Sequence, residues 1–342
     1  MSENNCCCCS SGGCCGTPAI QTVSTRLTFK DKFSALKVRF GIGRMSYTVE
    51  PGVYAVGKPD ENAPVLVSAN YKLTFDSLRK ELSGVNCWLL ILDTKGVNVW
   101  CAAGKGTFGT NELIRRISET RLTEIVSHKT LILPQLGASG IDANEVKRQS
   151  GFSVVYGTVR SNDIKAFLQS GNKAMNEMRT VKFTMRDRLV LTPMEIIPAA
   201  RKSLYVFGVL FLFNLFAVKP FGLMDFIAYI GPVITGTFIT PLLLSLIPGR
   251  AFSLKGGFLG LLWAAGAIWL NGWINPFQWL LAIGYLLVLP SVSAYLAMNF
   301  TGSSTYTSPS GVLKEMKIAL PIMIISSVIG VVLILLSRIF GL

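Results

Sequence analysis

The 342-residue sequence predicts a Rossmann-like α/β domain followed by a transmembrane domain of about five helices. Short apolar runs alternate with helical patterns between residues 65 and 168, and apolar stretches of membrane-crossing length fill residues 203–342. The formal net charge of +14 belongs largely to the first 200 residues. A basic soluble part beside a membrane suits anionic lipid headgroups, and no basic motif interleaved with aromatic residues indicates nucleic acid.

Residues 1–20 form a low-complexity tail that is rich in cysteine. No basic segment precedes an apolar core there, so we expect no signal peptide, a cytoplasmic soluble part and reduced thiols. Contiguous cysteines do not give the spacing of a structural zinc site. Two interpretations stay open: thiols that capture a soft cation, or incidental cysteines of an unstructured or lipidated tail. These cysteines are Cys6, Cys7, Cys8, Cys9, Cys14 and Cys15.

Residues 21–180 form the predicted α/β domain. Its first part, residues 22–60, mixes β-branched and basic residues, as at 36–40, and predicts either short strands or an N-terminal arm. A buried strand at 65–67 then leads into a helix at 74–82, with Thr74 as its N-cap. Asn70 follows that strand on the side where open α/β sheets bind ligands. It is either a ligand contact or a turn residue that satisfies its own backbone.

The rest of this domain continues the alternation. Cys87 lies inside a strand and is most simply a core residue. His128, the only histidine, precedes a strand and is expected at the surface, which argues against a Ser-His-Asp unit or a His-rich zinc site. Gln135 and Gly137 belong to a loop small enough to approach a large cofactor. The expected strands are 87–93, 130–133 and 154–156, and the expected helices are 111–120 and 162–168.

The most informative stretch is 98–105, which follows an apolar run and a turn. Ala102 and Ala103 would let a flat ligand approach the backbone, and Gly104 would end a short helical turn. Cys101 lies near the start of that turn, where backbone N–H groups favour a thiolate, a soft metal ligand. Alternatively, Cys101 is a small buried hydrophobe. The segment 104–109 matches G-x-G-x-x-G, but it does not follow a strand directly, so a dinucleotide site is poorly supported.

A basic connector, residues 181–202, is expected to add a strand before the membrane. Beyond it we expect five spans, at about 203–219, 224–247, 256–274, 277–298 and 318–338. Internal Pro232, Pro241 and Pro290 predict kinked helices that need neighbours. Six cations flank the inner ends and two the outer ends, which puts the N-terminal domain in the cytoplasm and the C-terminus outside. These are Arg201, Lys202, Arg250, Lys255, Lys314 and Lys317 inside, and Lys219 and Arg338 outside.

The octapeptide at 98–105, Asn-Val-Trp-Cys-Ala-Ala-Gly-Lys, resembles the cap-helix motif of the corrinoid protein that methylates mercury in certain anaerobes. Further similar segments extend the resemblance over about residues 60–340: 64–74, 93–96, 133–138 and 151–157. A looser similarity leads to the corrinoid domain of the corrinoid/iron–sulfur protein of acetyl-CoA metabolism. There Ala-Ala-Gly-Lys also follows an Asp-Thr-x-Gly turn, but no cysteine occupies the position of Cys101.

The resemblance implies a cobalt corrinoid held between a Rossmann-like domain and the cap segment, with Cys101 as thiolate lower axial ligand. It also implies methyl transfer from cobalt to Hg(II), giving methylmercury. The cysteine-rich tail lies outside the resemblance, so capture of Hg(II) there rests only on the softness of thiols. Implied partners are a ferredoxin-like iron–sulfur reductant and a methyl-donating methyltransferase. Two alternatives are a membrane-bound corrinoid methyl carrier and a transporter or receptor with a soluble regulatory domain. The cofactor-binding residues would be Asn70, Asn98, Val99, Trp100, Cys101, Ala102, Ala103, Gly104, Lys105, Gln135 and Gly137.

Overall fold

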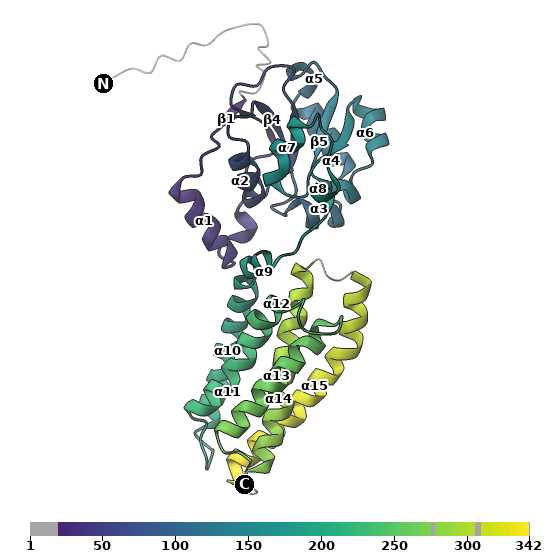
Figure 1. Cartoon of the computed structure of the whole chain (residues 1–342). Coiled ribbons are helices and arrows are strands. Elements are labelled where there is room, and N and C mark those ends of the chain that lie inside the picture. Colours follow the sequence, from purple (N-terminus) through teal and green to yellow (C-terminus); the bar gives the residue numbers. More distant parts are fainter. Residues whose placement is uncertain (1–19, 275–277, 305–308, 342) are drawn as a thin grey trace, which may run out of the picture. The chain divides into compact units, whose positions relative to one another are not determined.

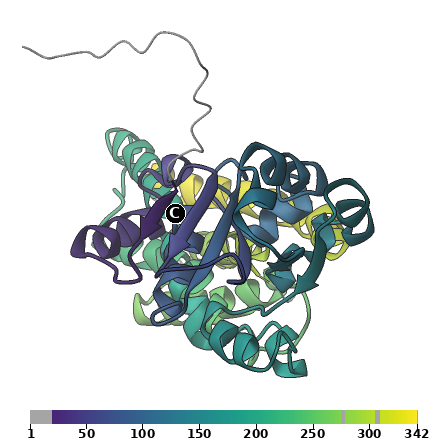
Figure 2. The same ribbon diagram turned by 90° about the horizontal axis from the view of Figure 1, so that it is seen from above.

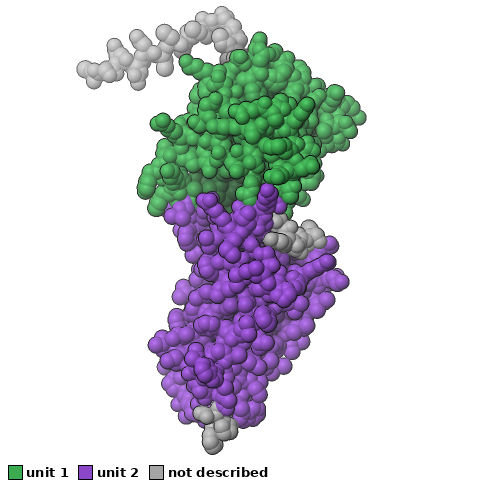
Figure 3. All heavy atoms as spheres, in the orientation of Figure 1, with its two compact units in different colours: residues 1–35, 43–180 green, residues 36–42, 181–342 purple. Residues whose placement is uncertain are grey.

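The computed structural model describes residues 20–274, 278–304 and 309–341 (Figure 1). The chain divides into two compact units (Figure 3). The first comprises residues 1–35 and 43–180, and the second comprises residues 36–42 and 181–342. The cysteines of the predicted tail lie outside the described residues.

The first unit contains a six-stranded sheet in the order β1-β2-β4-β3-β5-β6. Strands β4, β3, β5 and β6 run parallel, whereas β2 pairs antiparallel with β4 and parallel with β1. Every residue of β3 and β4 is buried, as the apolar runs predicted for strands covered on both faces. The strands are β1 Gln21–Val23, β2 Gly52–Val56, β3 Val65–Ala69, β4 Cys87–Leu92, β5 Thr130–Leu133 and β6 Ser153–Tyr156.

Helices cover both faces of this sheet, and alternate strand residues supply two cores (Figure 2). Leu90 and Leu92 belong to the core that includes Ala102 and Phe108, whereas Leu89 packs in the opposite core. The mixed α/β domain is therefore confirmed. Its helices are α2 Lys72–Glu81, α3 Val99–Lys105, α4 Thr110–Glu119, α5 Leu122–Ile125, α6 Ala143–Ser150, α7 Ile164–Gln169 and α8 Asn176–Arg179, with 3₁₀ turns η1 Arg44–Ser46, η2 Gln135–Gly140 and η3 Ser161–Asp163. Helix α1, Phe29–Arg39, begins in this unit, and its residues 36–39 are counted with the second.

A cluster of four charged side chains joins α1 to α2. Lys72 Nζ lies 2.8 Å from Asp31 Oδ1 and 2.7 Å from Asp76 Oδ2. Arg79 contacts the same two carboxylates, at 3.0 and 2.7 Å. Burial by itself would raise the pKa of Asp31, but hydrogen bonds from Lys72 and Thr28 hold it well below its ordinary value. Each charge thus has two opposite partners, and the N-terminal arm is fixed to the sheet domain through α2.

Three local predictions were wrong. Residues 36–40 are not a strand but belong largely to helix α1, because apolar residues recur there at helical spacing. Thr74 is not the N-cap of α2, which begins at Lys72 with Tyr71 in the cap position. The connector forms helix α9, Met185–Leu191, instead of a strand, because Thr184 and Asp187 make a reciprocal capping box that starts a helix.

The second unit contains five helical segments that are long and apolar enough to cross a membrane. Their number agrees with the sequence prediction. The first begins earlier than expected, because α9 leads directly into α10, Pro193–Phe213, with Pro193 in the first helical turn. The segments are Met185–Phe213, Leu223–Leu242, Phe252–Leu270, Trp279–Gly302 and Ser310–Phe340. Their helices after α10 are α11 Leu223–Ile234, the π-helical η4 Thr235–Ile239, α12 Thr240–Leu242, α13 Phe252–Leu270, α14 Trp279–Asn299, the short η5 Phe300–Ser303 and α15 Pro309–Phe340.

Pro232 inside α11 shows how a neighbouring helix compensates a proline in an apolar unit. Proline has no N–H, so the carbonyl of Ala228, four residues earlier, lacks its usual helical partner. The indole N–H of Trp263 on α13 donates to that oxygen at 3.0 Å. Gly231 makes room for the indole, since a Cβ there would lie 1.8 Å from Trp263 Cε2. The expectation that Pro232 needs a neighbour is confirmed.

The charged cluster gives a first prediction. Asp31→Asn removes one of two carboxylates shared by Lys72 and Arg79, and we expect it to destabilise the α1–α2 attachment by about 2–3 kcal/mol. Because the folded pKa of Asp31 lies below its ordinary 3.8, its contribution is complete above that pH and lost as pH falls further. The protection of residues 27–40 against hydrogen exchange, relative to the intrinsic rate at the same pH, should fall in the variant at neutral pH and in the wild type below about pH 4. Equal exchange rates in variant and wild type at neutral pH would show that the cluster does not hold α1.

Candidate functional site

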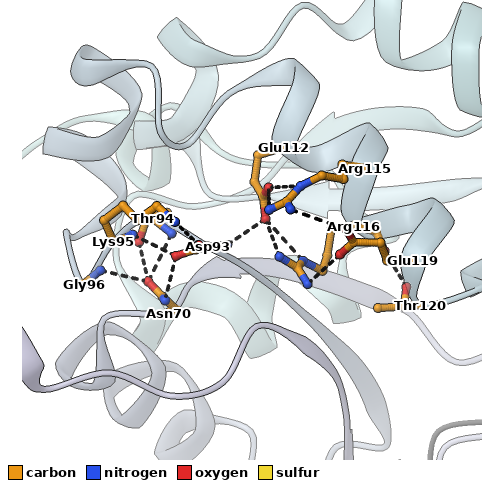
Figure 4. A network of polar contacts seen from close by, with 10 residues as sticks. All are labelled: Asn70, Asp93, Thr94, Lys95, Gly96, Glu112, Arg115, Arg116, Glu119 and Thr120. Carbon is orange, nitrogen blue, oxygen red and sulfur yellow. Dashed lines mark hydrogen bonds and ion pairs between the residues drawn. The ribbon is translucent and has the colours of Figure 1, made fainter.

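The carboxyl ends of the parallel strands β3 and β4 meet at one edge of the sheet, where Asn70 connects them (Figure 4). Asn70 is buried and its Oδ1 accepts three hydrogen bonds. The donors are the Thr94 N–H at 3.1 Å, the Thr94 hydroxyl at 2.9 Å and the Gly96 N–H at 3.1 Å. Its Nδ2 donates to Asp93 Oδ1 at 3.2 Å. Of the two interpretations, the structure favours a turn residue, although the backbone that Asn70 satisfies belongs to the next strand's turn.

Glu112, on the first turn of α4, binds the same turn from its other side (Figure 4). Its Oε1 accepts the Asp93 N–H at 2.9 Å and contacts Arg116 Nη2 at 2.8 Å, while Oε2 contacts Arg115 Nη2 at 2.5 Å. Burial opposes ionisation of Glu112, but the hydrogen bonds from Asp93, Arg116 and Arg115 lower its pKa. The carboxylate is therefore charged near neutral pH and fixes the end of β4 to α4.

The cap segment itself is the seven-residue helix α3. Asn98 is its N-cap, and Asn98 Oδ1 accepts the Cys101 N–H at 2.9 Å. Gly106 ends the helix in the left-handed conformation, with φ 78°. The prediction that Gly104 ends the turn was therefore wrong by two residues. Gly104 lies inside the helix instead.

The two faces of α3 have different tasks. Val99, Ala102 and Ala103 are buried in the core, with 6, 0 and 5% of their surface exposed. Within the described chain these three residues therefore anchor α3 in the core, and a contact of the two alanines with a flat ligand stays a prediction. Trp100, Gly104 and Lys105 are exposed and Cys101 is partly exposed. Because residues at i, i+1, i+4 and i+5 share a face of a helix, these four residues form one surface, hereafter the outer face of α3.

The turn η2 packs directly against the cap segment. A Cβ on Gly137 would lie 2.5 Å from the ring of Phe108, and one on Gly140 would lie 3.0 Å from Ala103 Cα. The glycines of this loop thus allow α3 and Phe108 to pack closely against it, and Gly137 is buried by that packing. Gln135 differs, because its Oε1 is buried and has no hydrogen-bond partner among the described residues. Such an orphaned acceptor is a candidate for a ligand contact.

Two other residues considered in the sequence, Cys87 and His128, lie away from the cap segment. Cys87 lies in the core of β4, and burial raises the pKa of its thiol to about 12, so it is an inert core residue as predicted. His128 contacts the Ala63 carbonyl oxygen through Nε2 at 2.9 Å, and its Nδ1 accepts the Thr130 N–H at 3.2 Å. It thus sits at the start of β5, away from the carboxyl edge. Among residues 20–274, 278–304 and 309–341, no group of three or more His, Cys, Asp or Glu side chains could hold a metal ion.

Sequence comparisons find relatives of the α/β unit that contains this site. Residues 35–168 match the family model of the CO dehydrogenase/acetyl-CoA synthase delta subunit. The acetyl-CoA decarbonylase/synthase complex subunit gamma of Methanocaldococcus jannaschii is 35% identical over 139 residues, 40% of this chain and 28% of that subunit. The same subunit of Methanopyrus kandleri is 37% identical over 124 residues, 35% of this chain and 26% of that subunit. That of Archaeoglobus fulgidus is 32% identical over 139 residues, 39% of this chain and 29% of the subunit.

The chain thus spans little more than a quarter of the length of these curated relatives. This domain is like the corrinoid domain of acetyl-CoA metabolism. The expected looser similarity is therefore confirmed, whereas mercury methylation is not part of it. The family match ends at residue 168, before the apolar helices begin.

Sequence reasoning missed two residues that build the site. Glu112 is missed because its partner is the backbone of a turn nineteen positions earlier, although an acidic residue in a first helical turn is a visible signal. Phe108 is fully buried against the cap and η2. Its signal was the pair of glycines around it, which indicates close packing of backbone.

Asn70 gives the second prediction. Asn70→Ala leaves the Thr94 and Gly96 N–H groups without their acceptor, and we expect a loss of about 2–4 kcal/mol in the free energy of unfolding. Hydrogen exchange at residues 94–101 should rise more than exchange in β5. Ser118→Ala, at an exposed position of α4, serves as control and should leave both unchanged. Unaltered protection of the turn in Asn70→Ala would contradict the role given to this amide.

Proposed function

We propose that the first unit is a Rossmann-like corrinoid-binding domain whose cofactor lies on the outer face of α3. In this proposal the chain transfers a methyl group from cobalt to Hg(II) and forms methylmercury, with Cys101 as thiolate lower axial ligand. The observation that carries the proposal is the partly exposed thiol of Cys101 on a face that contains Trp100 and Gly104. The cofactor would then lie outside the cap helix instead of between it and the sheet, because α3 packs directly on η2.

The outer face suits a large flat ligand. Gly104 has a helical position with no atom near the place of a Cβ, so neither a positive φ nor tight packing within the described chain requires a glycine. Glycine inside a helix costs about 1 kcal/mol relative to alanine. Close approach of a ligand to the backbone would explain it. Trp100 offers an aromatic surface and Lys105 a hydrogen-bond donor for polar side groups.

Each residue of α3 would have a definite role. A bound corrinoid would supply a cobalt-borne methyl group for transfer to Hg(II), and an electron-rich sulfur from this chain would hold its cobalt. Cys101 provides that sulfur. Asn98 holds the Cys101 backbone by accepting its N–H, which fixes the sulfur on the outer face. Val99, Ala102 and Ala103 act indirectly, by anchoring the helix in the core.

A second function is that of a membrane-bound corrinoid methyl carrier that passes the methyl group to a metabolite. The similarity to subunits of an acetyl-CoA decarbonylase/synthase complex favours it. Both functions call for a methyl-donating methyltransferase and for a reductant. We propose a separate ferredoxin-like iron–sulfur protein as the reductant, because the cysteines of this chain lack the spacing of an iron–sulfur site.

We further propose that the five apolar helices cross the cytoplasmic membrane, with the first unit in the cytoplasm and the C-terminus outside. The distribution of six inner and two outer cations supports this orientation. The tail cysteines from Cys6 to Cys15 remain candidates for Hg(II) capture by soft thiols.

The third prediction concerns Cys101. Anaerobic cells that contain this chain and a ferredoxin-like partner should form methylmercury from added Hg(II), and Cys101→Ala should abolish the product at equal protein level. Cys87→Ala is the matched control, because it removes a thiol from the core of the same unit and should retain activity. Product surviving in Cys101→Ala would exclude the proposed thiolate role. Absence of product from the wild type, with bound corrinoid visible in its absorption spectrum, would favour the methyl carrier.

The fourth prediction concerns Gly104. Gly104→Ala should raise the free energy of unfolding by about 0.5–1 kcal/mol, because alanine is the better helix former. The new methyl group would project from the outer face and should lower the corrinoid retained after anaerobic purification, measured as cobalt per chain. Ser118→Ala on α4, at an exposed position away from α3, should not change retention. Full retention in Gly104→Ala would mean that no ligand lies close to this backbone.

A further inference from the structure

Helix α1 is drawn in purple in Figure 1. It carries a stripe of exposed apolar side chains. Phe29, Phe33, Leu36 and Phe40 have 82, 48, 51 and 38% of their surface exposed. Their spacing of four, three and four residues places them within about 60° of one another at about 100° per residue. Just beyond the helix, Ile42 and Met45 are also exposed, at 56 and 75%. Large apolar side chains on one narrow line of a surface mark an interaction site.

The fold holds this stripe outward. Asp31 and Val38 lie on the opposite side of the helix, about 180° away. Asp31 is fixed by its ion pairs with Lys72 and Arg79. Rotation of α1 to bury its phenylalanines would break both ion pairs. The exposed aromatic rings are therefore a built feature of α1.

Cations border the stripe on both sides. Lys30 and Lys37 lie about 80–100° to one side of it, and Lys32 and Arg39 lie about 60–80° to the other. Arg44 follows in the next turn. The only acidic residue between positions 26 and 49 is Asp31, which two cations neutralise. Apolar rings between two rows of cations match a bilayer surface, where the rings enter the acyl boundary and the cations reach phosphates.

We propose that α1 is an interfacial helix that binds the surface of an anionic membrane. The charge pattern favours lipid over a second copy of the chain, because pairing two such stripes would bring ten cations together. A bilayer is also the partner that the sequence itself provides, since the proposed spans belong to the same chain. The proposal rests on the proposed membrane placement but not on corrinoid chemistry. It gives the soluble unit a lipid attachment of its own, in addition to the spans.

The test uses the full chain in lipid nanodiscs that contain a phosphatidylglycerol with a photoreactive acyl chain. Cross-linked peptides from residues 27–45 are measured by mass spectrometry relative to those from Phe252–Leu270. We expect cross-links to α1 in the wild type. The triple variant Phe29→Ser, Phe33→Ser, Leu36→Ser should reduce them roughly fivefold or more while cross-links to α13 stay unchanged. Met175→Ser, which removes an apolar side chain exposed at 62% elsewhere in the first unit, is the control.

A second variant addresses the charges. Lys30→Glu with Lys32→Glu should remove the preference for phosphatidylglycerol over phosphatidylcholine, and high salt should weaken that preference in the wild type. Circular dichroism checks that both variants fold. Cross-links confined to the spans, or unchanged in the triple variant, would overturn the proposal. Protein–protein cross-links at α1 would assign the stripe to a partner chain. Absence of cross-links to α13 as well would refute the membrane placement itself.

Discussion

The amide of Asn70 is the interaction on which the candidate site depends. Its oxygen accepts three hydrogen bonds from a turn that follows a different strand, so one side chain fixes the ends of β3 and β4 relative to each other. Glu112 holds the other side of that turn through the Asp93 N–H. With both sides fixed, the chain leaves β4 in a defined direction, and Asn98 starts α3 at a defined place. A helix of only two turns has little stability of its own, so the position of α3 must come from such contacts.

One side of helix α3 packs in the core, and the opposite side presents the side chains proposed for chemistry. Its small residues, Ala102 and Ala103, are buried in the same core as Phe108, and Ala103 lies close to Gly140 of η2. A larger side chain at either position would not fit without movement of the helix. Its outer face keeps a thiol, an indole and a glycine. This division explains why one short motif contains both the smallest side chains and a tryptophan. It also shifts the proposed corrinoid from a position beneath the cap to a position above it, where a methyl donor, a reductant and Hg(II) could approach the free side.

Patterns of local periodicity predicted most of the fold, and long-range partners account for what they missed. The buried runs of β3, β4 and β5 and the five apolar helices follow directly from composition and spacing. Residues 36–40 were misjudged because alternating apolar and basic residues also suit the exposed side of a helix whose other side is fixed by Asp31. Asn70 was placed correctly at the strand end, but no local pattern shows that its amide is already occupied by Thr94 and Gly96. Burial of Ala102 likewise depends on a loop more than thirty residues away.

The similarity to archaeal complex subunits and the apolar helices belong to different parts of the chain. The family match begins at residue 35, inside α1, so the aromatic half that starts at Phe29 precedes it. If α1 binds the bilayer, the sheet domain is held by lipid at its N-terminal arm as well as through the connector after residue 180. Two attachments restrict rotation of a rigid domain far more than one does, because a single flexible tether leaves all orientations accessible. The ion pairs of Asp31 with Lys72 and Arg79 would then join the lipid-bound helix to α2. Helix α2 follows directly after the end of β3, where Asn70 supports the turn before the cap.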